Sequence, residues 1–189
     1  MKKFLVVVLV SFFYIAATYA APLSSYTVEH NAQQVVAPKG MLQYILDALP
    51  DDSQILKKCI TENNQKTDSF SKYFIVSKAN LTKNPNETYF VRPALEPYCM
   101  AFYGAHLFRY WFVKVDTTHS DLTFTLVLQG GGDGIAVLAD ETNGYKYISS
   151  TSHTAIELYT RIYRFNGTQY ELVSCTLENL STEKTTLCE

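Results

Sequence analysis

The amino-acid sequence predicts a mainly β, α+β domain, in which an antiparallel meander forms a barrel or a sandwich and an N-terminal helical segment packs on it. Three observations predict this fold. From residue 70 onward, short apolar stretches with alternating polar residues recur about every 8–12 residues without intervening helices. Asn-Gly pairs at Asn143 and Asn166 separate such stretches, and Asn-Gly is a strong signal for a hairpin turn. Tyr (14) and Phe (11) are abundant, which suits half-buried strands.

The first 20 residues have the pattern of a signal peptide. Lys2 and Lys3 precede an apolar run over 4–15, and the small residues Thr18 and Ala20 form a cleavage site. The run is shorter than the roughly 20 residues of a membrane-spanning helix. We therefore expect a secreted or periplasmic protein that has no membrane span after signal cleavage.

Three further segments follow the signal peptide within one globular domain. Residues 21–38 are expected to form an exposed arm with one short edge strand. Residues 39–63 are expected to be helical, because apolar side chains recur at helical spacing from Met41 to Leu49 and again from Ile55 to Ile60. Pro50 separates the two helices, and the charges of Asp51 and Asp52 are interpreted as part of a solvated helix face.

Residues 64–189 are expected to form the antiparallel β domain. Its strands are predicted over 72–77, 88–92, 102–103, 106–115, 122–128, 135–138, 145–150, 155–165 and 169–175.

The four cysteines predict two disulfides. An exported protein with an even number of cysteines usually forms disulfides, and the spacing contains no CxxC pair of the kind that binds zinc or exchanges thiols. We favour Cys59–Cys99, which would join the helical segment to the sheet, and Cys175–Cys188, which would join the last strand to the C-terminal tail.

The charge balance argues against a nucleic-acid partner. Signal cleavage removes two lysines and no acidic residue, leaving 14 basic and 18 acidic residues. No basic patch with interleaved aromatic residues follows from that balance. The four histidines, at residues 30, 106, 119 and 153, lack metal-ligand spacing, so neither a metal nor another cofactor is predicted.

Two stretches of this sequence are similar to known exported proteins. Phe74 to Thr82 and Asn86 to Val91 form a strand–turn–strand pattern, and a tyrosine-rich hairpin follows at 163–170. Over about Phe70–Cys175 the chain resembles uncharacterised secreted bacterial β-rich domains. In those domains the turn often carries acidic calcium ligands, which residues 82–86 lack. The resemblance implies an exported bacterial protein and implies no activity.

Candidate binding residues lie in two places. Gly131, Gly132 and Asp133 belong to the glycine-rich segment 130–134, which lacks the Lys and Ser/Thr of a phosphate loop and is interpreted as a flexible hairpin turn or bulge. Arg109 and Trp111 belong to an aromatic stretch, and Trp and Arg are typical anchors of protein interfaces.

Strand alternation separates that aromatic stretch into two faces. Phe108 and Phe112 are expected in the core, with Tyr110 turning its hydroxyl outward. Arg109 and Trp111 share the opposite face, which is either displayed or covered by the helices.

The sequence favours a non-catalytic protein, and the first hypothesis is a binding or inhibitor module that presents 130–134 or 93–104 to a protein or cell-envelope partner. One alternative is a small-ligand carrier with a β-barrel cavity. A second alternative is a hydrolase, in which Ser152, His153 and Asp133 or Asp140 could form a Ser-His-Asp site, although no nucleophile-elbow motif is present. No catalytic residue is assigned, and the oligomeric state is left open.

Overall fold

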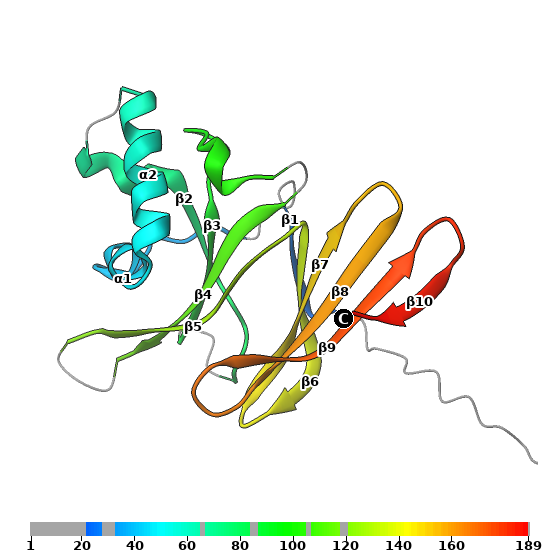
Figure 1. Cartoon of the computed structure of the whole chain (residues 1–189). Helices are drawn as coiled ribbons and strands as arrows, with labels where there is room; N and C mark the ends of the chain where they lie inside the picture. Colours follow the sequence, from blue (N-terminus) through cyan, green and yellow to red (C-terminus); the bar gives the residue numbers. More distant parts are fainter. Residues whose placement is uncertain are drawn as a thin grey trace, which may run out of the picture.

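A computed structural model of the protein describes residues 22–27, 33–64, 67–83, 87–104, 107–117 and 121–188. The predicted signal peptide at 1–20 lies outside the described residues. Figure 1 shows two antiparallel sheets and a pair of helices. The sheets are separate and do not close on each other, so the mainly β, α+β prediction is confirmed in its sandwich form.

The four-stranded sheet is a simple meander in the order β2-β3-β4-β5. Its strands are β2 (Phe74–Lys78), β3 (Thr88–Pro93), β4 (Phe108–Asp116) and β5 (Thr123–Gly132). Strand β4 lies in the middle, where Trp111 is paired with Val91 on β3 and with Gln129 on β5. The long aromatic stretch therefore forms a central strand that is covered on both faces.

The six-stranded sheet has the order β1-β6-β7-β8-β9-β10. Its strands are β1 (Ser24–Thr27), β6 (Gly134–Thr142), β7 (Tyr145–His153), β8 (Glu157–Phe165), β9 (Tyr170–Asn179) and β10 (Lys184–Leu187). Both predicted Asn-Gly turns are present between consecutive strands. Gly144 and Gly167 adopt positive φ angles of 76° and 109°, which glycine accepts without strain.

Two strands lie at the edges of the six-stranded sheet. Strand β1 is the short edge strand expected within residues 21–38; it pairs with β6 and buries Tyr26. Strand β10 comes from the C-terminal tail and pairs with β9. Its four residues are all exposed, so no apolar alternation signalled it in the sequence.

Helices α1 (Met41–Ala48) and α2 (Pro50–Glu62) lie in the segment where the sequence predicts helices. Pro50 occupies the first turn of α2, where its missing N–H costs no helical hydrogen bond. Two short 3-10 helices, η1 (Thr67–Tyr73) and η2 (Met100–Phe102), complete this part of the chain. The prediction of a strand at 102–103 is wrong. Only Tyr103 forms a β-bridge, and it does so with β4. The disulfide of Cys99 holds this segment beside α2.

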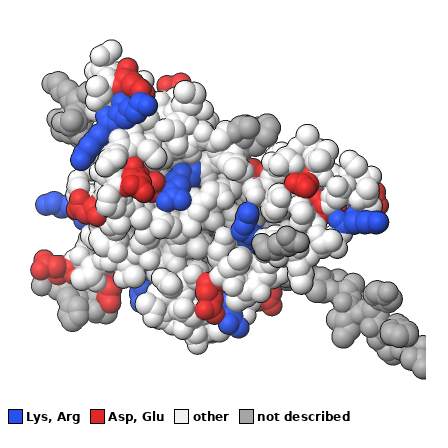
Figure 2. All heavy atoms as spheres, viewed as in Figure 1, with Lys and Arg blue, Asp and Glu red and all other residues white. Residues whose placement is uncertain are grey.

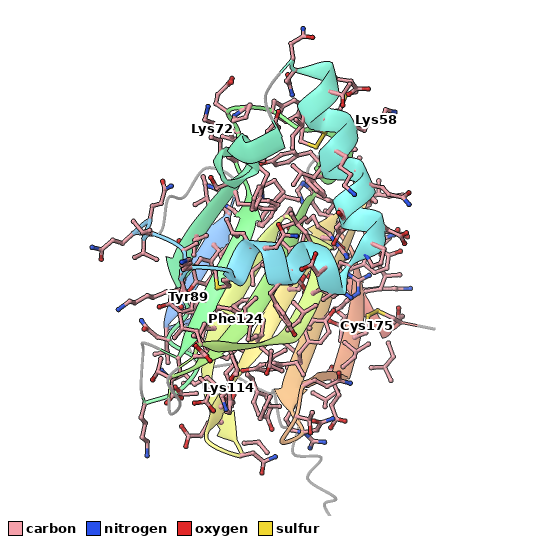
Figure 3. The ribbon with its side chains drawn as sticks, turned by 90° about the vertical axis from the view of Figure 1, so that its left-hand side faces the viewer. Lys58, Lys72, Tyr89, Lys114, Phe124 and Cys175 are labelled. Carbon is pink, nitrogen blue, oxygen red and sulfur yellow. A yellow bond between two sulfur atoms is a disulfide. The ribbon has the colours of Figure 1, made fainter. Side chains whose placement is uncertain are left out.

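The four-stranded sheet separates two apolar cores. Figure 3 shows α1 and α2 in front of this sheet, with Phe124 behind α1, where its ring lies 5.7 Å from that of Tyr44. The first core fills the space between the helices and the sheet and includes Trp111. The second core fills the space between the two sheets and includes Phe90 and Phe112.

The two faces of β4 confirm the alternation expected from the sequence, with one correction. Phe108 and Phe112 lie in the core between the sheets, while Trp111 lies under the helices. The prediction that Tyr110 turns its hydroxyl outward is wrong. Tyr110 is fully buried, and its hydroxyl has no hydrogen-bond partner among the described residues. Burial raises the pKa of this hydroxyl well above its ordinary value.

Both favoured disulfides are present. Cys59 on α2 bonds to Cys99, with Cα atoms 5.4 Å apart, and Cys175 on β9 bonds to Cys188 after β10, with Cα atoms 5.3 Å apart. The first bond is buried and the second closes the C-terminal hairpin. The prediction of the pairing is therefore confirmed.

The glycine-rich segment 130–134 is not a hairpin turn. Gly130 to Gly132 end β5 in one sheet, and Gly134 begins β6 in the other sheet, so the chain crosses between sheets at Asp133. A Cβ atom at Gly130 would lie 2.5 Å from the Tyr110 hydroxyl, and one at Gly132 would lie 2.7 Å from the Ser150 hydroxyl. Gly130 is needed for close packing against Tyr110 on the neighbouring strand β4, and Gly132 for close packing against β7 of the other sheet, rather than for a displayed loop.

Gly130→Ala is expected to destabilise the protein by about 2–3 kcal/mol, because the new methyl group overlaps a fully buried tyrosine. Gly131→Ala is the matched control. Its Cβ would meet only a backbone oxygen at 3.9 Å, so a change below about 0.5 kcal/mol is expected. Urea unfolding of both variants measures the difference, and equal stability would contradict the packing described for Gly130.

Candidate functional site

A surface pocket lies where the helical layer meets one end of the four-stranded sheet. Three parts of the chain line it: the N-terminal turns of α2 from Asp51 to Ile55, the segment Ala101 to Gly104 with Leu107, and the strand residues Phe108, Arg109 and Gly131. Its volume is about 430 Å³. Pockets of this size accommodate a small ligand or a projecting side chain (about 300–1,000 Å³).

A buried carboxylate organises one wall of the pocket. Asp52 is only 5% exposed. Its Oδ2 atom accepts hydrogen bonds from Trp111 Nε1 at 3.0 Å and from Arg109 Nε and Nη2 at 3.3 and 3.1 Å. A buried charge needs such partners, since an unpaired one would be very costly. Asp52 thus ties α2 to the central strand of the sheet.

Arg109 is held at the pocket wall from several sides. Besides its bonds to Asp52, its Nη2 atom donates to Gln129 Oε1 at 2.7 Å, and its guanidinium lies 5.9 Å from the Trp111 ring centre. Its side chain is 32% exposed. The guanidinium is therefore fixed in orientation and still reachable from the pocket.

The segment between β3 and β4 forms the other wall and is fixed at several points. Cys99 is covalently bonded to α2, and Asn63 Nδ2 at the end of α2 donates to the Tyr98 carbonyl at 3.2 Å. Tyr103 donates its hydroxyl to the Pro93 carbonyl at 2.8 Å, and its ring stacks on that of Tyr98 with centroids 5.1 Å apart. These bonds hold residues 93–104 in one conformation.

Two ionisable groups support the base of this segment. Arg92 is buried at 2% exposure and donates from Nη1 to the Pro93 carbonyl at 3.1 Å. Burial lowers the pKa of Arg92, and the neighbouring Tyr103 partly opposes that effect. Burial raises the pKa of Tyr103, and the positive charge of Arg92 counteracts it. Both groups hold the segment in place beneath the pocket rim.

Large apolar side chains remain exposed along this fixed segment. They are Leu95 (45%), Tyr98 (47%), Met100 (73%) and Leu107 (37%). Figure 2 shows the surface in the same view as Figure 1, with charged side chains lying singly or in small groups and wide uncharged areas between them. Clusters of exposed apolar side chains beside a pocket are typical of interaction sites.

Three of the five candidate binding residues lie together at this site. Arg109 and Gly131 both line the pocket and are paired across β4 and β5, and Trp111 holds Asp52 behind its wall. Gly132 and Asp133 lie elsewhere. Gly132 packs against Ser150 in the other sheet, and Asp133 sits at the crossing point between the sheets.

Asp133 belongs to a separate polar cluster with β7. Its Oδ1 atom accepts the Thr151 hydroxyl at 2.9 Å, and its Oδ2 atom bonds to the backbone N–H and the ring Nδ1 of His153. Ser152 does not join them, because neighbouring side chains of a strand point to opposite faces. Its hydroxyl instead accepts from Arg161 Nη1 at 3.0 Å. The Ser-His-Asp arrangement considered with Ser152 is therefore not formed.

Sequence reasoning missed Asp52, Gln129 and the exposed apolar residues of the segment before β4. Asp52 was interpreted as part of a solvated helix face, and this interpretation is wrong. A signal was available, because Asp52 precedes Leu56 by four positions and Cys59 by seven, which places it on the buried face of α2.

Within the described residues, no group of three or more His, Cys, Asp or Glu side chains is arranged to hold a metal ion. No helix in the described part of the chain is both long and apolar enough to cross a membrane.

Comparisons with protein-family models, with curated proteins and with solved structures gave no significant match to this chain. The functional interpretation therefore rests on the residues of the site itself.

Proposed function

We propose that the protein is an exported, non-catalytic binding or inhibitor module that engages a protein or cell-envelope partner in the periplasm or outside the cell. The binding surface consists of residues 93–104 and Leu107 together with the pocket lined by Arg109 and Gly131. Export is supported by the signal-peptide pattern of residues 1–20 and by the two disulfides. The resemblance to secreted bacterial β-rich domains favours a bacterial source.

One observation carries the proposal: a segment that is covalently tied to α2 exposes Leu95, Tyr98 and Met100, and it continues into the wall of a pocket that the exposed Leu107 also lines. Exposing Met100 and Tyr98 to water brings no stability, whereas burying them against a partner would. Because the disulfide and the Tyr103 hydrogen bond already order the segment, a partner would bind without a large ordering cost.

The same structure gives the two alternatives less support. Aromatic rings fill the space between the sheets, where Tyr26 stacks on Phe90 with centroids 4.2 Å apart and Phe90 lies 5.1 Å from Phe112. That packing does not favour a carrier that holds its ligand between the sheets. Among the described residues, the Ser152 hydroxyl accepts a hydrogen bond from Arg161 and not from a histidine, which does not favour a hydrolase with Ser152 as its nucleophile.

Met100→Asp is expected to abolish capture of the partner. The wild-type protein and the variant would be immobilised and exposed to the envelope extract and culture medium of the cells that export the protein. Placing a carboxylate at the most exposed position of an apolar interface should weaken binding at least about tenfold. Quantitative mass spectrometry of the eluted proteins would measure the loss.

Leu187→Asp on β10 is the matched control, because Leu187 is 76% exposed and Met100 is 73% exposed. Both variants should unfold at the wild-type temperature, since neither side chain is buried. A protein retained by the wild type and Leu187→Asp but lost with Met100→Asp supports the proposal. Equal retention by all three proteins would contradict it.

A further inference from the structure

The pocket is lined by one positively charged side chain and two negatively charged ones. The positive charge of Arg109 is matched by Asp52, whose Oδ2 atom lies 3.1 Å from Arg109 Nη2. Asp51 also lines the pocket, is exposed, and has no hydrogen bond or ion pair within the described part of the chain. Among the described residues that line the pocket, Arg109 is the only cation and Asp52 pairs with it, so Asp51 adds a negative charge that none of these residues neutralises.

Polar and apolar groups both line the pocket. Ile55 contributes hydrocarbon surface from α2, and Leu107 contributes it from the opposite wall. Gly131 contributes no side chain, and a Cβ atom at this position would meet only the Phe108 carbonyl oxygen at 3.9 Å. The pocket is therefore open along the strand, and its apolar part can contact a hydrocarbon side chain.

From these two observations we infer that the pocket receives an aromatic or large aliphatic side chain of a peptide segment, whose neighbouring Lys or Arg pairs with Asp51. This inference rests on the proposed binding function and specifies the chemistry of the partner. Burial of the apolar side chain supplies most of the affinity, and the exposed ion pair adds a smaller, salt-dependent contribution.

The test is a selection of random peptides displayed on phage against the wild-type protein, with removal of phage that also bind Gly131→Leu. The leucine side chain fills the pocket without entering the core, because Gly131 faces open space. The expected sequences carry an aromatic or large aliphatic residue next to a basic one. A synthetic peptide of the selected sequence should bind Gly131→Leu at least about tenfold more weakly in fluorescence polarisation.

Asp51→Asn tests the charge assignment. It should weaken the same peptide about three- to fivefold, and added salt should reduce wild-type affinity while leaving that of the variant nearly unchanged. Asp121→Asn, on an exposed loop before β5, is the control and should bind like the wild type. If Gly131→Leu fails to fold, Leu107→Asp replaces it in the selection, because Leu107 lines the pocket and is 37% exposed.

Three results would overturn the inference. They are selected peptides that are acidic, peptides that bind Asp51→Asn as tightly as the wild type, and a selection that yields no pocket-dependent sequence. The first two leave the proposed function intact, since binding still depends on the pocket. The proposed function itself fails only if the capture experiment with Met100→Asp shows no loss.

Discussion

Asp52→Ala is expected to lower the free energy of unfolding by about 2–4 kcal/mol. The substitution removes the acceptor of the Trp111 indole N–H, which is fully buried, and the counter-ion of Arg109. Arg109 is partly exposed, so water can solvate its guanidinium when the carboxylate is removed. The expected loss of stability is therefore smaller than the largest values found for fully buried ion pairs. Chemical denaturation at neutral pH measures this change.

Asp51→Ala provides the control for this prediction. Asp51 is the adjacent residue, carries the same charge at the same helix end, and is exposed, so its removal should cost less than about 1 kcal/mol. The loss of stability caused by Asp52→Asn should lie between the losses caused by Asp51→Ala and Asp52→Ala, because the amide oxygen can still accept the Trp111 indole N–H. Equal effects of Asp51→Ala and Asp52→Ala would show that Asp52 does not anchor α2 to the sheet.

Replacing both Cys59 and Cys99 with serine is expected to destabilise the protein by about 4 kcal/mol, the chain-entropy value for a loop of this length. The bond joins residues 40 positions apart and is buried between α2 and the segment before β4. The segment should also lose its fixed shape, and binding of the selected peptide should weaken together with stability. Thermal unfolding and peptide titration would measure both effects.

The second disulfide is the matched comparison. Cys175 and Cys188 are 13 positions apart at the exposed C-terminal hairpin, so replacing both with serine should cost at most about 3 kcal/mol. Peptide binding should stay unchanged below the unfolding temperature, because this hairpin belongs to the other sheet from the pocket. Loss of binding in the Cys175/Cys188 variant would contradict the location of the site.

Local sequence signals predicted most of the fold. The Asn-Gly pairs located two hairpins, and the helical spacing of apolar residues located α1 and α2. These features depend on a few neighbouring residues. The assignment of strands to two sheets did not follow from such signals, because the crossing at Asp133 looks in sequence like any glycine-rich turn. The close contact of Gly130 with Tyr110 depends on the register of β4 and β5, and that of Gly132 with Ser150 depends on how the two sheets pack.

The candidate site was predictable in part. Strand alternation placed Arg109 and Trp111 on one face, and the glycine run drew attention to Gly131. Asp52 was overlooked because its partner Arg109 is 57 residues away, and a carboxylate in the first turn of a helix is ordinarily solvated. The display of Tyr98 and Met100 depends on the pairing of Cys99 with α2, which sequence spacing alone leaves among three possibilities.

In the proposed binding mode, residues 93–104, Leu107 and the pocket contact the partner. The most direct test is hydrogen–deuterium exchange of the intact protein with and without the selected peptide. We expect slower exchange in residues 98–104 and in the first turns of α2, with no change in β8 to β10. Slower exchange confined to the six-stranded sheet, with none around the pocket, would contradict this binding mode.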